Sequence, residues 1–421
     1  MNKLVKKFVM LRRNRKGTRL IQWGFAALLV GLMPVPGAWA DHAVKIGWIG
    51  PLSGWGTAGG TAIMRGTELA VDHINTAGGV RGHQLELVTR DSEAKPDRAI
   101  TVARELIGRE EVYALIGKFD SSSAKALNPV LHESGVPMML SIAAATKNIE
   151  YDRDPNFMFR TSGADHYIAE FLVNFVMKEF GANKIAIGYE DTGYGFGGRD
   201  DITKALEKLN VAPAAKVKFS RSDTDMTAQA LVVQKSDADV IILYSIAKAD
   251  AMMIRSLNKV GVSIPVVCAW AASSPELPKF AGPLADGVTV MQTFSFMDPN
   301  LNELGQKVAA DFVRKHNIPD ISQMVTPAFT AHAYDGMLLL AAAMNKTDLS
   351  FKDGDLEEDR AKIRDSLEAD LGPVRGLIKT YEPAFTKDNH DSVGPSDYIM
   401  TVWKGGKLIP YQGKHNWGKQ R

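Results

Sequence analysis

Short apolar runs rich in β-branched residues alternate along the chain with longer segments whose apolar residues recur at helical spacing. In a first series, strands are predicted at 44–49, 85–89, 112–116 and 137–141, and helices at 61–75, 96–107 and 121–133. In a second series, strands are predicted at 184–189, 215–219, 239–244 and 264–268, and helices at 165–180, 197–209, 226–234 and 248–260. Because strands that alternate with helices form parallel sheets covered on both faces, the pattern predicts an α/β protein with two doubly wound lobes in tandem.

The two series open on similar segments. "KIGWIGPLSGWG" (45–56) and "KIAIGYEDTGYG" (184–195) both start with Lys-Ile and place a Gly-aromatic-Gly triplet nine residues after the lysine. Chance similarity is the alternative, since glycine is common where strands turn into helices. If the match is real, Trp55 and Tyr194 occupy corresponding places in two similar lobes.

Each segment continues into a literal G-x-G-x-x-G, at 54–59 and 193–198. In a dinucleotide-binding fold, the first glycine follows the strand directly and an acid lies about 20 residues further on. Here Gly54 lies four residues after Gly50, where the strand ends, and Asp91 lies 32 residues beyond Gly59. We therefore interpret the glycines as cleft loops that let a ligand approach the backbone, and not as a nicotinamide site.

The first forty residues have the pattern of a secretory signal peptide. Eight basic residues precede an apolar run at 24–35, and Ala38-Trp39-Ala40 forms a small-x-small cleavage site. The run is shorter than the roughly 20 residues that span a bilayer, which disfavours an uncleaved anchor. Cleavage before Asp41 is expected, and the mature protein should be exported.

Charge and cysteine content exclude several classes of protein. Cleavage would remove eight of the 50 basic residues and none of the 48 acidic ones, which leaves no basic stripe for nucleic acid. The single cysteine, Cys268, excludes an internal disulfide and any multi-cysteine metal site. The nine histidines include no pair at i, i+4 spacing. We expect neither a metal nor a cofactor.

Residues 50–107 and 113–140 carry the most specific pattern of the chain, which includes Ile74-Asn75 followed by Gly78-Gly79. Together with Phe159-Arg160-Thr161 and Tyr194-Gly195, they resemble the solute-binding proteins of ABC transporters, in the branched-chain amino acid (leucine/isoleucine/valine) binding family. The resemblance runs over nearly the whole chain after the signal peptide.

This resemblance implies a type I periplasmic-binding fold, in which three crossovers join two Rossmann-like lobes that enclose one small ligand. It implies a signal peptide at 1–40, lobe 1 at 41–160 plus 295–390, and lobe 2 at 161–294 plus 391–421. It also implies a monomeric periplasmic protein without catalytic activity, whose partner is the membrane permease of an ABC importer.

The resemblance further implies contacts with the ligand's carboxylate. Ser121 matches the family's carboxylate-binding serine, and both Ser121 and Ser122 open a predicted helix, where hydroxyls and free amides favour an anion. Simple N-capping is the alternative explanation for these serines. The family's second polar loop matches 142–146, which makes Ala144 and Thr146 candidate contacts unless the segment is only a turn of small residues.

Aromatic residues make up the remaining candidates. Tyr194 matches a cleft aromatic of the family, and Trp55 is a candidate with core packing as its alternative. In the family, an acidic residue binds the ammonium of the ligand, and Trp270 lies near the position of that acid in this sequence. Asp120 stands where the family has a cysteine of its first-lobe disulfide. We hypothesise a carboxylate or amide ligand without an α-amino group, stacked by Trp55, Tyr194 and Trp270, unless Asp120 or Asp191 supplies an acid.

We consider three classes of function, of which the sequence favours the first. The first is a binding protein that delivers a branched-chain amino acid, an amide or an aromatic acid to an importer. A ligand-sensing protein that presents its bound state to a receptor or sensor kinase has the same fold and is the alternative. A hydrolase built on Ser121 is disfavoured, because no G-x-S-x-G surrounds that serine.

Overall fold

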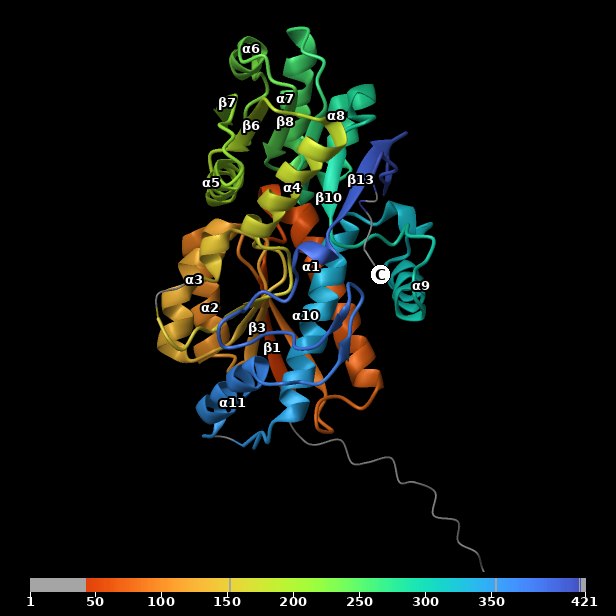
Figure 1. The fold of residues 1–421 in the computed structure, drawn as a ribbon. Helices are drawn as coiled ribbons and strands as arrows, with labels where there is room; N and C mark the ends of the chain where they lie inside the picture. Colours follow the sequence, from red (N-terminus) through yellow and green to blue (C-terminus); the bar gives the residue numbers. More distant parts are fainter. Residues whose placement is uncertain (1–42, 151–152, 353, 416, 418–421) are drawn as a thin grey trace, which may run out of the picture. The chain divides into compact units, whose positions relative to one another are not determined.

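The computed structural model describes residues 43–150, 153–352, 354–415 and 417 (Figure 1). The predicted signal peptide lies outside these residues. None of the helices in the described part of the chain combines the length and the hydropathy that a bilayer crossing requires.

Five parallel strands form the sheet of lobe 1, in the order β2-β1-β3-β4-β5. They are β1 (Val44–Gly50), β2 (Leu85–Asp91), β3 (Ala114–Gly117), β4 (Met138–Leu140) and β5 (Met158–Arg160). The connecting helices are α1 (Thr57–Thr76), α2 (Pro96–Gly108) and α3 (Ser121–Ser134). Later segments add α9 (Glu303–His316), α10 (Pro327–Lys346) and α11 (Leu356–Glu368). Helix α10 packs directly on α1, where a Cβ on Gly66 would lie 2.3 Å from the carbonyl oxygen of Thr330.

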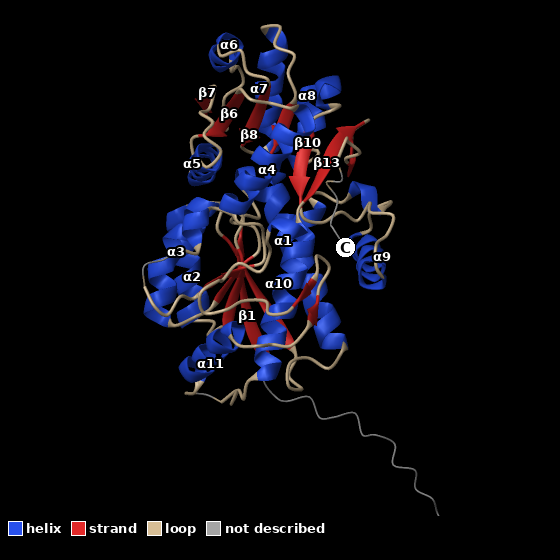
Figure 2. Cartoon of the chain, in the orientation of Figure 1, coloured by secondary structure: helices blue, strands red, loops and turns tan. Residues whose placement is uncertain are grey.

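Seven strands form the sheet of lobe 2, in the order β14-β13-β10-β9-β8-β6-β7. Figure 2, which draws strands in red, labels β7, β6, β8, β10 and β13 of this sheet. The parallel strands are β6 (Ile185–Glu190), β7 (Ala215–Phe219), β8 (Val240–Tyr244), β9 (Val266–Cys268) and β10 (Thr289–Gln292). The edge consists of antiparallel β13 (Ile399–Lys404) and β14 (Lys407–Pro410). The helices are α4 (Asp165–Phe180), α5 (Gly193–Glu207), α6 (Thr227–Lys235), α7 (Ala247–Lys259) and α8 (Glu276–Ala281). Cys268 ends β9 and is buried.

Short elements complete the fold. A separate hairpin pairs β11 (Val374–Arg375) with β12 (Thr380–Tyr381). The 3-10 turns are η1 (Gly54–Gly56), η2 (Thr146–Asn148), η3 (Trp270–Ser273), η4 (Gly282–Ala285), η5 (Ile321–Gln323) and η6 (Pro395–Asp397).

Three crossovers connect the two sheets. The chain leaves β5 for α4, returns after β10 to the helices that complete lobe 1, and crosses again to β13. The predicted α/β fold with two doubly wound lobes and three crossovers is confirmed, whereas the exact residue limits of the lobes stay a prediction. The sequence pattern missed β5, β10, β13 and β14, since each is short or antiparallel and lies outside the regular alternation.

The two glycine segments lie at the cleft as predicted, since Trp55 and Tyr194 line one cavity between the lobes, but they are helical turns and not loops. Gly59 and Gly60 lie in the first turn of α1, and the whole segment Gly193–Gly198 lies within α5. A Cβ on Gly60 would come 1.7 Å from the carbonyl oxygen of Pro51, and one on Gly195 would come 2.0 Å from that of Glu190. These glycines therefore let each helix pack closely against the end of the preceding strand.

Helix α4 binds the C-terminal segment through the buried carboxylate of Glu179. Its oxygens accept hydrogen bonds from Trp417 Nε1 (2.8 Å), the Tyr411 hydroxyl (3.2 Å) and the Lys414 amide (2.6 Å). Burial alone would raise the pKa of Glu179, but the hydrogen bonds outweigh it and lower the pKa to about 2.

Replacement of this carboxylate by an amide tests the contribution of the segment to stability. Because the folded-state pKa lies below the ordinary value of 4.5, the ionised group stabilises the fold above about pH 5 and loses that effect as the pH falls through about 2. Glu179→Gln should lower the free energy of unfolding by about 1.5–3 kcal/mol at pH 7, measured by urea denaturation. The difference from wild type should shrink as the pH falls from about 5 to 2.

The matched control is Glu170→Gln, at a more exposed site on the same helix, where Glu170 pairs with Lys208. Surface pairs of this kind contribute about 0–1 kcal/mol. Equal stability of the two variants at pH 7 would contradict the assigned role of Glu179.

Candidate functional site

The serines at the start of α3 contact neighbouring segments of the chain through their hydroxyl groups. Asp120 is the N-cap of the helix, and its Oδ1 accepts the amide of Ser123 at 2.7 Å. Ser121 is therefore not the capping residue, and its Oγ instead accepts the amide of Ala145 at 3.2 Å. Because a hydroxyl can accept and donate at the same time, Ser121 keeps a proton to donate to a ligand.

The second polar loop, residues 142–146, is fixed by Arg160. Nη1 of this buried arginine donates to the carbonyl oxygens of Ala144 (2.6 Å) and Ala145 (3.0 Å). Its Nε and Nη2 donate to the two carboxylate oxygens of Asp391, at 2.6 and 3.0 Å. Burial lowers the pKa of Arg160, but the Asp391 carboxylate outweighs it, so the pKa is raised and the charge is retained.

The first crossover is packed against the same loop. The amide of Asp165 donates to the carbonyl oxygen of Ala144 at 2.9 Å, and its Oδ1 accepts the hydroxyl of Tyr244 at 2.6 Å. Burial raises the pKa of Asp165 to about 8, although the Tyr244 hydroxyl and the charge of Arg160 act against this shift. Asp165 therefore holds its proton at neutral pH and adds no charge beside the loop.

A small cavity between the lobes, here called the inner cavity, brings together most of the predicted contacts. Trp55, Ser121, Ala144, Tyr194 and Trp270 all line it, and its free volume is about 30 Å³. That volume holds about two water molecules, so a ligand requires the surrounding side chains or the lobes to move apart. Residues from both lobes thus face one another across this space.

Aromatic rings form the walls of the inner cavity. Trp270 is buried and meets Phe329 edge-on at a centroid distance of 5.3 Å. Phe119 lies 6.0 Å from Phe329 and 5.3 Å from Trp55. Trp55 is 42% exposed, which excludes the alternative that it is packed in the core. The walls suit the stacking of a flat or apolar ligand.

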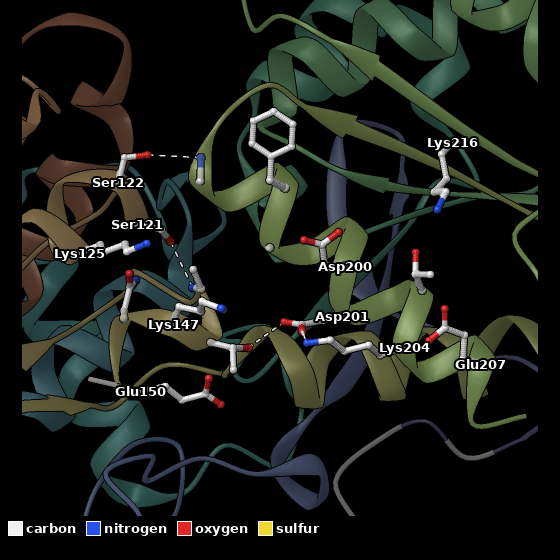
Figure 3. Close-up of a pocket in the computed structure, with 17 residues that line it drawn as sticks. Ser121, Ser122, Lys125, Lys147, Glu150, Asp200, Asp201, Lys204, Glu207 and Lys216 are labelled. Atoms are coloured by element: carbon white, nitrogen blue, oxygen red, sulfur yellow. Dashed lines mark hydrogen bonds and ion pairs between the residues drawn. The ribbon is translucent and has the colours of Figure 1, made fainter. Parts of the chain in front are cut away.

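Ser122 and Thr146 line a different space, the outer groove, which has a volume of about 700 Å³ (Figure 3). Ser122 Oγ accepts the amide of Gly193 at 3.3 Å, and Thr146 Oγ1 donates to Asp201 Oδ2 at 2.7 Å. Both hydroxyls therefore bridge the lobes. Ser121 lines the outer groove as well as the inner cavity, so the two spaces meet at this residue. Ligand contact by any of the seven predicted residues stays a prediction.

Charged side chains from both lobes surround the outer groove. Lys125, Lys147 and Glu150 lie on the lobe 1 side, and Asp200, Asp201, Lys204, Glu207 and Lys216 on the lobe 2 side (Figure 3). Positive and negative groups are equally represented among these residues, so the groove has no preference for one sign of charge.

Two acidic residues, Asp120 and Asp191, are candidates to bind an ammonium group of the ligand, and only one of them lines the inner cavity. Asp191 is exposed and does not line the inner cavity. Asp120 does line it, but its Oδ2 lies 3.6 Å from the ammonium of Lys118, a buried residue whose pKa is lowered by that burial. Trp270 stands where the resemblance would place the acid. A ligand ammonium would thus find no carboxylate in this cavity except one already paired with a cation.

Sequence reasoning missed Arg221, Glu190 and Phe329. Arg221 lies between β7 and α6, and its guanidinium carbon lies 3.7 Å from the ring centroid of Trp55, in the other lobe. Its partner Glu190 ends β6 and is fully buried. No motif surrounds Arg221, so its role depends on contacts that only the folded chain brings together.

Comparisons with known proteins agree with this architecture. A family model described as periplasmic binding protein matches residues 43–407. An amino acid binding protein of Pseudomonas aeruginosa is 26% identical over 386 residues, which cover 91% of this chain and 96% of that protein.

Two solved structures share the fold at low sequence identity. One is the branched-chain amino acid transporter substrate binding protein LivJ of Streptococcus pneumoniae in complex with isoleucine, with a TM-score of 0.75 and 22% identity over 88% of this chain and 99% of LivJ. The other is an ABC transporter solute binding protein of R. palustris in complex with 4-hydroxybenzoate, with a TM-score of 0.73 and 20% identity over 90% of this chain and 99% of that protein.

Proposed function

The chain belongs to the periplasmic binding protein family, as the sequence resemblance predicts, and on that premise we propose that it is the solute-binding component of an ABC importer. It encloses a small carboxylate-bearing ligand between its lobes and delivers it to a membrane permease. Export through a cleaved signal peptide at 1–40 brings the protein to the periplasm, where it acts as a monomer.

The observation that carries this proposal is the meeting of predicted contacts from both lobes at the inner cavity. Lobe 1 contributes the Ser121 hydroxyl at the start of α3, where free backbone amides and the helix dipole favour an anion. Lobe 2 contributes Tyr194 and Trp270. A ligand that touches both sides stabilises their approach, and this approach changes the surface presented to the permease.

The proposed ligand is a carboxylate that lacks an α-amino group, and an aromatic acid fits best. Aromatic walls and the missing free carboxylate support this choice. The R. palustris protein in complex with 4-hydroxybenzoate has the same fold, as does LivJ in complex with isoleucine, so the fold accommodates either type of ligand. Branched-chain amino acids and amides are the competing ligands.

Catalysis is not part of the proposal. The oxygen of Ser121 is bonded to the amide of Ala145, and among the described residues no histidine lies within hydrogen-bond distance of it. A serine without a base nearby is a poor nucleophile but a good hydrogen-bond donor.

A thermal-shift screen tests the ligand class. Benzoate, 4-hydroxybenzoate and 3-phenylpropanoate should raise the Tm, because a ligand bound only to the folded state adds about 2.7 kcal/mol of stability at a hundred times its Kd. Leucine and valine should have smaller effects. A strong shift with leucine or valine and none with the aromatic acids would contradict the proposed ligand.

Replacement of the candidate carboxylate contact tests the site itself. Ser121→Ala should weaken binding of the best ligand from the screen by about 1.5–3 kcal/mol in isothermal titration calorimetry, because a hydrogen bond to a charged group is lost. The control is Ser134→Ala at the other end of α3, where the hydroxyl donates to the carbonyl oxygen of Val130. Unchanged affinity in the Ser121 variant would remove this residue from the site.

A further inference from the structure

Arg221 connects the two lobes at the inner cavity. Its Nε donates to Glu190 Oε2 at 2.8 Å, and its Nη2 donates to Oε1 of the same carboxylate. The plane of the guanidinium covers the ring of Trp55 at 3.7 Å. Both Arg221 and Trp55 line the inner cavity.

The paired carboxylate is fully committed to its protein partners. In addition to Arg221, Glu190 accepts the hydroxyl of Thr192 at 2.5 Å and the amide of Ile246 at 3.3 Å. Glu190 has no exposed surface, whereas the side chain of Arg221 is 20% exposed. The ion pair is therefore oriented, with its negative end buried in lobe 2 and its positive end at the cavity wall.

The third guanidinium nitrogen is left for a ligand. Nε and Nη2 point to Glu190, and no hydrogen bond from Nη1 is seen among the described residues. An arginine fixed on two sides, by a carboxylate and by an aromatic face, loses little conformational freedom when it binds a further acceptor.

We propose that Arg221 is the specificity-determining residue of the inner cavity: it favours ligands with a carboxylate or carbonyl acceptor near Trp55 and rejects those with an ammonium there. This inference rests on the proposed function, because it assumes that the inner cavity is the ligand site. This role of Arg221 would also explain why no free carboxylate lies beside Trp270, because a site that rejects an ammonium does not need one. An ammonium would meet the positive end of the ion pair at short range, and the repulsion between the two like charges disfavours it there.

Two substitutions of opposite sign test this role. Arg221→Met keeps an apolar stem against Trp55 but removes the charge and leaves Glu190 unpaired. Glu190→Gln keeps the shape of the acid and leaves the arginine uncompensated. The readout is the ratio of Kd values within two ligand pairs that differ by one α-amino group: 3-phenylpropanoate with L-phenylalanine, and 4-methylpentanoate with L-leucine.

We expect the two substitutions to change the ratio of Kd values in opposite directions. Wild type should prefer the ligand without the amino group by about tenfold or more, Arg221→Met should reduce this preference by about tenfold, and Glu190→Gln should increase it. A purely structural role of Arg221 would weaken both members of each pair alike. A ratio that is the same in wild type and in whichever of the two variants folds, judged by circular dichroism, would overturn the inference.

Arg199 provides a matched control. Its guanidinium also covers aromatic rings of lobe 2, at 5.1 Å from Tyr189 and 5.2 Å from Phe196, and pairs with Asp200, but it does not line the inner cavity. Arg199→Met should leave the ratio unchanged. If wild type binds no member of either pair and no compound of the thermal-shift screen, the proposed function fails together with this inference. If wild type binds but the ratios do not respond, only the role of Arg221 fails.

Discussion

The buried ion pair between Arg160 and Asp391 is the interaction on which the rest of the site depends. It joins the end of β5, at the first crossover, to the start of the third crossover, 231 residues later in the sequence. The same guanidinium holds the carbonyl oxygens of Ala144 and Ala145. Loss of one partner from such a pair leaves an uncompensated charge and costs about 3–5 kcal/mol. One side chain thus fixes both the connection between the lobes and the loop that lines the inner cavity.

The position of this loop decides what the cavity can recognise. With the carbonyl oxygens of Ala144 and Ala145 turned toward Arg160, the amide of Ala145 meets the oxygen of Ser121. Lobe 1 therefore offers the hydroxyl of Ser121 at the start of α3, where the helix dipole suits an anion, beside the Asp120 carboxylate that is paired with Lys118. Lobe 2 completes the cavity with Tyr194, Trp270 and the positive end of the Arg221 pair. A site with donors on both sides and aromatic walls between them favours a carboxylate with a flat or apolar body.

Much of this arrangement can be predicted from the sequence. Periodicity gives the helices and strands of the two regular series to within a few residues: α4 and β7 match their predicted limits, whereas α1 and α5 each begin four residues earlier than predicted. The matching Gly-aromatic-Gly triplets correctly single out Trp55 and Tyr194, which line the same cavity.

Other features depend on contacts that no local pattern encodes. Gly60, next to the first imitated cofactor fingerprint, and Gly195, within the second, are sites of close packing between helix and strand, which are visible only when Pro51 and Glu190 are in place. Arg221 contacts Glu190, which ends a strand 31 residues earlier in the sequence, and the ring of Trp55 in the other lobe. The short strands β5 and β10 lie next to crossovers, outside the regular alternation of strands and helices, so the pattern does not identify them, whereas the equally short β3, β4 and β9 lie within the alternation and are predicted.

A crystal structure of the chain with a bound aromatic carboxylate would show directly whether the inner cavity is the ligand site. We expect the ligand to touch both lobes, with its carboxylate within hydrogen-bond distance of Ser121 Oγ or Arg221 Nη1 and its ring against Trp55, Tyr194 or Trp270. A ligand in the outer groove between Lys125 and Lys216, without contact to Ser121 or Arg221, would contradict this expectation.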